Sequence, residues 1–272
     1  MNKKIKNVLL KKNKTKIVSL TAYSKSIGKI LDKYVDIVLV GDSMANVLYG
    51  HKNTHKISLE NIIQHAQSVK MGIKKSLLVV DMPKGTYDSS KKALKNAKLI
   101  IKKTKCDAVK LENNGNNSKI IKSLTKNKIP VMGHIGYTPQ FNKFKIAGKT
   151  KIESLRLLKD AKLIEEAGAF SIILECVTAS AAKLVTKKIK IPTIGIGSSS
   201  NCDGQILVTD DMLGISGFYP KFVKKYINLE RIIEKAIKKY TREIKEEKFP
   251  KLTNFLNGRK NRKKSWIKKQ NN

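Results

Sequence analysis

The stretch Leu77-Leu78-Val79-Val80-Asp81 decides the fold, because a short apolar, β-branched run ends there in an acidic residue. Four apolar residues in succession predict a strand that is buried on both faces, as in a parallel sheet. Seven further runs of this kind recur along the chain, namely Lys16–Ala22, Asp36–Val40, Ala108–Leu111, Pro130–Gly133, Ser171–Leu174, Pro192–Ile196 and Gln205–Val208.

Longer segments with helical spacing separate these runs. They are Ser24–Lys33, Leu59–Met71, Ser89–Lys103, Ser118–Lys126, Ile152–Ala167 and Ala179–Lys188. Alternating strands and helices predict a parallel α/β sheet, and eight such units within 272 residues favour a closed (β/α)₈ TIM barrel over an open sheet. We therefore expect residues 1–247 to form a single catalytic domain. The N-terminal residues and Leu229–Glu247 would lie outside the eightfold repeat, and residues 248–272 would form a basic, flexible tail.

The net charge of +36 suggests a nucleic-acid partner at first sight. Of the 57 basic residues, however, only five are arginine, the side chain that suits phosphate recognition best. Lysines spread over every segment indicate solvated surfaces, so nucleic acid is not the expected partner. The cluster Arg259–Lys264 leaves a weak RNA contact by the tail as an open alternative.

The sequence gives no sign of export, of a membrane span or of a structural metal. No apolar stretch reaches 18 residues, and Met1–Lys4 leads into a mixed basic segment without a cleavage site. The three cysteines are widely spaced and form no CxxC pair. We expect a cytoplasmic protein that acts on small molecules.

Ionisable residues close several of the predicted strands. In a barrel, the residues that act on substrate come from the C-terminal ends of the strands. Asp42, Asp81 and Glu112 would therefore meet at one mouth and repel one another unless a cation lies among them. Hard oxygen ligands without His or Cys suit Mg²⁺. Lys110 lies two residues before Glu112 and faces the same way, so a structural ion pair between these two is the alternative.

Glu175 and His134 are the other candidates at the predicted mouth. Glu175 follows the buried run Ile172–Leu174, and a carboxylate that emerges there suits a general base. A pairing with a neighbouring lysine is the competing interpretation. His134 stands between Gly133 and Gly136, where it could reach a ligand in an accessory role or serve as a structural histidine.

The motifs at the strand ends, in their order and spacing, resemble the ketopantoate hydroxymethyltransferase family from about Lys16 to Tyr226. These motifs are Thr21-Ala22-Tyr23, Val40-Gly41-Asp42-Ser43, Tyr49-Gly50-His51, Asp81-Met82-Pro83, Val109-Lys110-Leu111-Glu112, Gly133-His134-Ile135-Gly136, Thr138-Pro139-Gln140, Leu174-Glu175-Cys176-Val177, Ile194-Gly195-Ile196-Gly197 and Asp203-Gly204-Gln205.

The resemblance implies a decameric barrel of the phosphoenolpyruvate/pyruvate superfamily that acts in pantothenate biosynthesis. The family transfers a hydroxymethyl group from 5,10-methylenetetrahydrofolate to 3-methyl-2-oxobutanoate, giving 2-dehydropantoate. By position, the resemblance assigns Mg²⁺ to Asp42, Asp81 and Glu112. It assigns the substrate to Asp42, Ser43, Asp81 and Lys110, and proton removal to Glu175.

The chain departs from the family pattern mainly in Phe141–Thr150, which is shorter than the family's glycine-rich loop and bears on folate affinity. Two other interpretations stay open on the sequence. One is a Mg²⁺-dependent lyase or mutase of the same superfamily that acts on another 2-oxo acid. The other is a basic, nucleic-acid-associated barrel.

Overall fold

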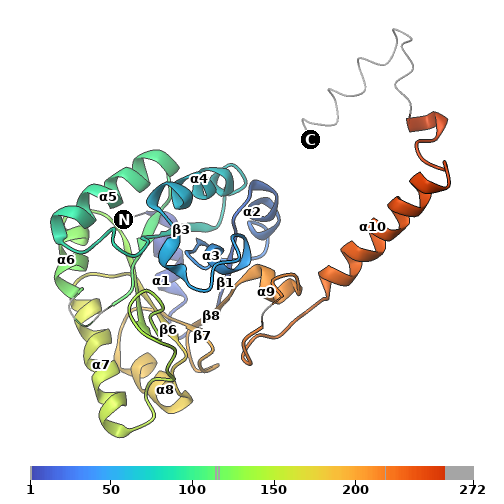
Figure 1. The fold of residues 1–272 in the computed structure, drawn as a ribbon. Coiled ribbons are helices and arrows are strands. Elements are labelled where there is room, and N and C mark those ends of the chain that lie inside the picture. Colours follow the sequence, from blue (N-terminus) through green and yellow to red (C-terminus); the bar gives the residue numbers. More distant parts are fainter. Residues whose placement is uncertain (1, 114, 116, 218, 255–272) are drawn as a thin grey trace. The chain divides into compact units, whose positions relative to one another are not determined.

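Eight parallel strands form a closed barrel, in which each strand pairs with the next and β8 returns to β1 (Figure 1). The computed structural model describes residues 2–113, 115, 117–217 and 219–254. The strands are β1 (Ile17–Thr21), β2 (Ile37–Val40), β3 (Leu77–Asp81), β4 (Ala108–Lys110), β5 (Val131–Gly136), β6 (Ser171–Glu175), β7 (Thr193–Ile196) and β8 (Gly204–Leu207). The barrel predicted from the eight apolar runs is confirmed.

The strand β5 runs three residues beyond the predicted Pro130–Gly133. Its glycines have low β propensity, so the sequence pattern ends early. The backbone nevertheless stays in register, with His134 opposite Ile173 and Gly136 opposite Glu175. His134 therefore lies on a strand, where the barrel fixes its position.

Helices follow the strands, and side-chain caps explain where several of them begin. They are α1 (Lys3–Leu10), α2 (Lys25–Leu31), α3 (Met44–Val47), α4 (Leu59–Lys70), α5 (Ser90–Thr104), α6 (Ser118–Lys126), α7 (Lys151–Glu166), α8 (Ala179–Lys188) and α9 (Thr209–Leu213), with a short 3₁₀ turn η1 (Thr54–Lys56). Ser58 and Asn61 form a capping box at α4, and Thr150 caps α7 by accepting from the amide of Glu153. The six predicted helices are present; Ser118–Lys126 and Ala179–Lys188 match at both ends, and the other four differ by one or two residues at an end.

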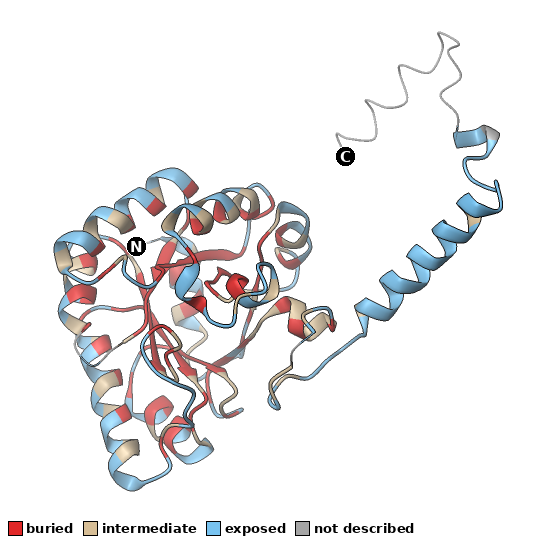
Figure 2. Cartoon of the chain, in the orientation of Figure 1, coloured by how far each residue is buried: buried red, intermediate tan, exposed pale blue. Residues whose placement is uncertain are grey.

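The apolar core has two layers. One lies between the strands and the surrounding helices, and the other fills the barrel itself (Figure 2). Ile5 and Val8 of α1 pack with Ile17, Ile37 and Leu77, the first residues of their strands. Because α1 closes the N-terminal end of the barrel, the C-terminal end is left for a site.

The chain divides into two compact units, residues 1–227 and 228–272, and each is described here by itself. In the second, α10 (Leu229–Lys245) has no buried residue, and a 3₁₀ turn η2 (Leu252–Asn254) follows (Figure 2). Whether residues 1–247 act as one domain stays a prediction, and most of the predicted tail lies outside the described residues. Among the helices of the described part, none is both long and apolar enough to span a bilayer.

Candidate active site

Three carboxylates lie buried at the C-terminal ends of β2, β3 and β4. Asp42 follows β2 by two residues, Asp81 ends β3, and Glu112 follows β4 by two residues. The amide of Asp42 donates to Asp81 Oδ2 at 3.1 Å, which joins the first two strand ends directly. A Cβ at Gly41 would lie 3.0 Å from Ser43 Oγ, which is tighter than most Cβ contacts, so a larger residue there would require Ser43 to shift.

Lys110 is the cation within this acidic group, and its partner is Asp81 rather than Glu112. Its Nζ donates to Asp81 Oδ1 at 2.6 Å, and both side chains are buried. Burial alone would lower the pKa of Lys110, but the negative charges of Asp81, Asp42 and Glu112 outweigh it and raise the pKa. Lys110 therefore stays charged, and the ion pair considered between Lys110 and Glu112 is not formed.

One lysine does not balance three carboxylates. Burial raises the pKa of Asp81 to about 6, even with Lys110 beside it. Burial and then the charge of Asp42 raise the pKa of Glu112 well above its ordinary value, and burial likewise raises the pKa of Asp42. These raised values mean that additional positive charge would stabilise the ionised site.

The donor set suits a hard divalent cation, since it consists of carboxylate oxygens. Glu112 Oε1 is buried and has no hydrogen-bond partner among the described residues, so it is available as a ligand. As the side chains are placed, no three His, Cys, Asp or Glu residues of the described part form a finished metal cluster. The chemistry of the donor atoms nevertheless fits a hard divalent cation.

His134 links this acidic group to Glu175, the last residue of β6. Its Nε2 lies 3.1 Å from Glu175 Oε2, and its Nδ1 lies 3.7 Å from Glu112 Oε1. Neither ring nitrogen has a hydrogen bond of good geometry within the described residues. Burial lowers the pKa of His134, so the ring is neutral at physiological pH. The structure thus brings the predicted base and the accessory histidine together.

Ser43 lies half-buried at the end of β2, next to the acidic group. Its Oγ is 2.8 Å from the hydroxyl of Tyr23, a residue at the end of β1. Burial raises the pKa of Tyr23, which keeps the phenol protonated and able to donate. Every predicted site residue is therefore found at the same end of the barrel.

Gln140, which the sequence analysis named only as part of the motif Thr138-Pro139-Gln140, is central to the site. It is fully buried, and its Nε2 donates to Asp42 Oδ2 at 2.8 Å while its backbone N–H donates to Glu112 Oε2 at 3.0 Å. The hydroxyl of Tyr87 donates to Gln140 Oε1 at 2.5 Å, which fixes the orientation of the amide. The signal available in the sequence was a polar residue shortly after a strand end, within the motif Thr138-Pro139-Gln140.

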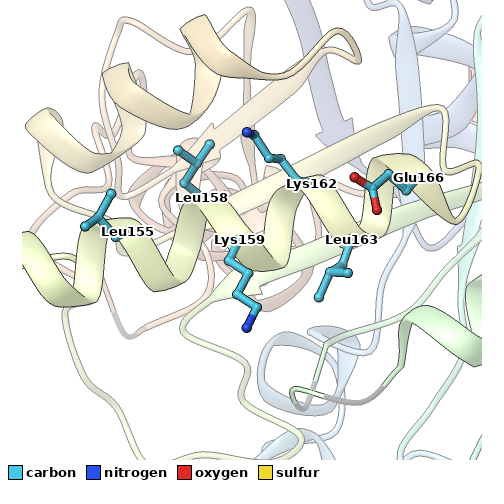
Figure 3. Close-up of a pocket in the computed structure, with 6 residues that line it drawn as sticks. All are labelled: Leu155, Leu158, Lys159, Lys162, Leu163 and Glu166. Atoms are coloured by element: carbon cyan, nitrogen blue, oxygen red, sulfur yellow. The ribbon is translucent and has the colours of Figure 1, made fainter.

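A hollow of about 320 Å³ lies on the surface of α7, away from these residues (Figure 3). All its lining residues come from α7, among them Leu155, Lys162 and Glu166. None of the strand-end residues contributes to it. The acidic mouth of the barrel is therefore the candidate active site.

Sequence comparison places this site within a known group of enzymes. The family described as ketopantoate hydroxymethyltransferase matches residues 3–252. A 3-methyl-2-oxobutanoate hydroxymethyltransferase of Pelagibacter ubique is 56% identical over 251 residues, covering 92% of this chain and 98% of the relative. The enzyme of the same name from Clostridium botulinum is 49% identical and covers 88% and 90%.

Solved structures of low identity share the fold. A phosphoenolpyruvate phosphomutase from Streptomyces platensis has a TM-score of 0.62 at 8% identity, covering 90% of this chain and 87% of its own. A 2,3-dimethylmalate lyase, described as a member of the PEP mutase/isocitrate lyase superfamily, has a TM-score of 0.59 at 12% identity and covers 94% and 93%. A phosphonopyruvate hydrolase solved with oxalate and Mg²⁺ has a TM-score of 0.56 at 10% identity and covers 90% and 88%. At these identities the likeness concerns the fold alone, which is the (β/α)₈ barrel predicted from the sequence.

Proposed function

The chain belongs to the ketopantoate hydroxymethyltransferase family, and on that premise we propose that it hydroxymethylates 3-methyl-2-oxobutanoate in pantothenate biosynthesis. Overall, the oxo acid, 5,10-methylenetetrahydrofolate and one water give 2-dehydropantoate and tetrahydrofolate. The observation that carries the proposal is Glu112 Oε1, a buried carboxylate oxygen that has no hydrogen-bond partner among the described residues and lies in the same site as His134 and Glu175. Such an atom needs a ligand to complete its hydrogen bonds.

Asp42, Asp81 and Glu112 would hold Mg²⁺, in keeping with their oxygen donors and unbalanced charge. A cation held there would supply positive charge that makes the proton on C3 of the oxo acid more acidic. Lys110 and the hydroxyl of Ser43 would hold the substrate's carboxylate and its developing negative charge. Asp42 and Asp81 would contribute to substrate binding through the cation that they hold. Burial of these residues keeps water away from the reacting atoms.

Glu175 would remove the C3 proton, which passes to its Oε2 or Oε1. Neutral His134, 3.1 Å from Glu175 Oε2, would position that carboxylate. The resulting C3 carbanion forms the new C–C bond to the one-carbon unit, whose bonds to folate nitrogen break. Water supplies the hydroxyl group, and the two folate nitrogens take up two protons, one from C3 by way of Glu175 and one from water, to give tetrahydrofolate.

Mg²⁺ binding is expected to weaken as the pH falls through about 6. Burial raises the pKa of Asp81 to about 6, and its protonated form cannot bind a cation. Below that pKa, protons compete with the metal, so binding at pH 5 should be at least about 10-fold weaker than at pH 7. Titration calorimetry in two buffers of different ionisation enthalpy would measure the affinity and the proton release. An affinity that does not change between pH 5 and pH 7 would contradict these ligands.

Gln140→Leu is expected to lower Mg²⁺ affinity and kcat/KM by about 10-fold to 100-fold. The substitution keeps the volume and the backbone bond to Glu112 but removes the amide that holds Asp42, and a hydrogen bond to a charged group contributes about 1.5–3 kcal/mol. Calorimetry and steady-state kinetics would measure both effects. Gln64→Leu, at an exposed position of α4, is the matched control and should change neither. Unaltered metal affinity in Gln140→Leu would rule out this role.

The remaining expectations concern the assembly and surroundings of the enzyme. A homodecamer, a cytoplasmic location and the absence of a nucleic-acid partner stay predictions. Sedimentation of the full chain would test the first of these, and RNA binding at low and high salt would test the last.

A further inference from the structure

The short turn η1 begins with a buried threonine, Thr54, and is anchored on two sides. On the side of β2, Asn46 Nδ2 in α3 donates to the carbonyl oxygen of His51 at 2.8 Å, which holds the segment that leads into the turn. On the other side, His55 Nε2 lies 3.0 Å from the carbonyl oxygen of Pro139, in the segment that follows β5. The turn therefore keeps a fixed place between the ends of two strands that carry the site.

The hydroxyl of Thr54 makes no hydrogen bond within the described residues. Only 5% of Thr54 is exposed, and its Oγ1 is buried. A buried hydroxyl in this state does not stabilise the fold, because it has lost its bonds to water and gained none in return. Packing of the side chain would need only its methyl groups. The unmade bond therefore points to a partner that Thr54 acquires when the site is occupied.

Asp42 is the charged group beside this hydroxyl. Burial raises the pKa of Asp42, and the hydroxyl of Thr54 is among the groups that lower it, so the two side chains are close neighbours. Within the described part of the chain, the one side-chain hydrogen bond that Asp42 accepts comes from Gln140 Nε2, at 2.8 Å. Lys110 donates to Asp81 instead. The carboxylate of Asp42 is thus held from one side, although it is a proposed metal ligand.

We propose that Thr54 is a positioning residue for Asp42, and that its hydroxyl donates a second hydrogen bond to this carboxylate when the carboxylate holds a cation. Gln140, in the segment after β5, and Thr54, in the turn after α3, then hold Asp42 from two sides. Loss of a group that orients a metal ligand typically weakens metal binding by about 10-fold to 100-fold. The inference rests on the proposed function, which assigns Asp42 to the metal site.

Two substitutions separate the hydroxyl of Thr54 from its methyl group. Thr54→Val keeps the shape and removes the hydroxyl, and we expect its Kd for Mg²⁺, measured by titration calorimetry, to rise about 10-fold. Its midpoint of urea unfolding without metal should stay the same or rise, because the hydroxyl makes no hydrogen bond that folding would lose. Thr54→Ser keeps the hydroxyl and should bind Mg²⁺ with a nearly normal Kd, whereas the lost methyl group should lower its unfolding midpoint.

Thr186→Val is the matched control, since it also removes a buried threonine hydroxyl, one that lies 2.8 Å from Oγ1 of Thr193, the first residue of β7. It should lower the unfolding midpoint and leave the Kd for Mg²⁺ unchanged, which is the opposite of Thr54→Val. The proposal is overturned if Thr54→Val binds Mg²⁺ normally, or if Thr54→Ser loses affinity to the same extent. Absence of Mg²⁺ binding and of C3 exchange in the unsubstituted enzyme would instead count against the proposed function, so the two failures can be told apart.

Discussion

Glu175→Gln is expected to slow deuterium exchange at C3 of 3-methyl-2-oxobutanoate by about 10²-fold to 10⁴-fold, the usual contribution of a general base. The amide keeps the shape of the side chain at the end of β6 but cannot accept the proton. Exchange in D₂O, followed by NMR without folate, isolates this step from the later transfer of the one-carbon unit.

The Kd for Mg²⁺ shows whether Glu175→Gln removes only the base or also disrupts the metal site. Glu175 is not among the proposed metal ligands, so calorimetry should give a nearly unchanged Kd in Glu175→Gln. Glu234→Gln, on the exposed surface of α10, is the matched control and should exchange at the normal rate. Exchange at the normal rate in Glu175→Gln would exclude it as the base.

The position of His134 is set by the strand pairing of β5, which the local sequence did not predict. Gly133 and Gly136 near it in the sequence suggested a side chain that could reach a ligand, with a structural histidine as the alternative. The extension of β5 instead fixes it opposite Ile173, with its ring between Glu112 and Glu175. A strand pairing formed with a later part of the chain is not visible in the local pattern around His134.

The partner of Lys110 illustrates the same limit. Spacing within one strand suggested Glu112, because residues two apart face the same way. The register of β3 and β4 places Asp81 directly opposite Lys110, so Lys110 pairs with Asp81 on the neighbouring strand. Strand ends and their chemical character follow from local sequence, whereas pairs across strands depend on the register of the closed barrel.

Gln140 was beyond prediction for a related reason. Its contacts reach Asp42, Met82 and Glu112, which stand on the ends of three other strands. The path of the segment after β5 brings the amide into the acidic group, and no periodicity in the sequence encodes that path.

The interpretation of most lysines as solvated fits the structure, in which Lys110 is the only buried lysine of the described residues.

Lys110→Met is expected to lower the free energy of unfolding by about 3–5 kcal/mol at pH 8 in the absence of metal, because it leaves buried carboxylates without their cation. The loss should shrink towards pH 5. Burial already raises the pKa of Asp81 to about 6, and removal of Lys110 would raise it further. A folded-state pKa above the unfolded value means that the protonated form is favoured by folding, so the variant gains stability as the pH falls and loses it as the pH rises.

Urea unfolding at pH 5 and pH 8 would measure this difference, and Lys98→Met, at an exposed position of α5, is the control that should show none. Asp81→Leu added to Lys110→Met should recover part of the stability at pH 8 without restoring C3 exchange, since both partners of the buried pair are then gone. An equal loss at both pH values would assign the effect to packing rather than to charge. Recovery of stability without C3 exchange would separate the effect of this ion pair on stability from its role in the reaction. The same buried charges lower the stability of the fold and are needed to bind the metal and the substrate.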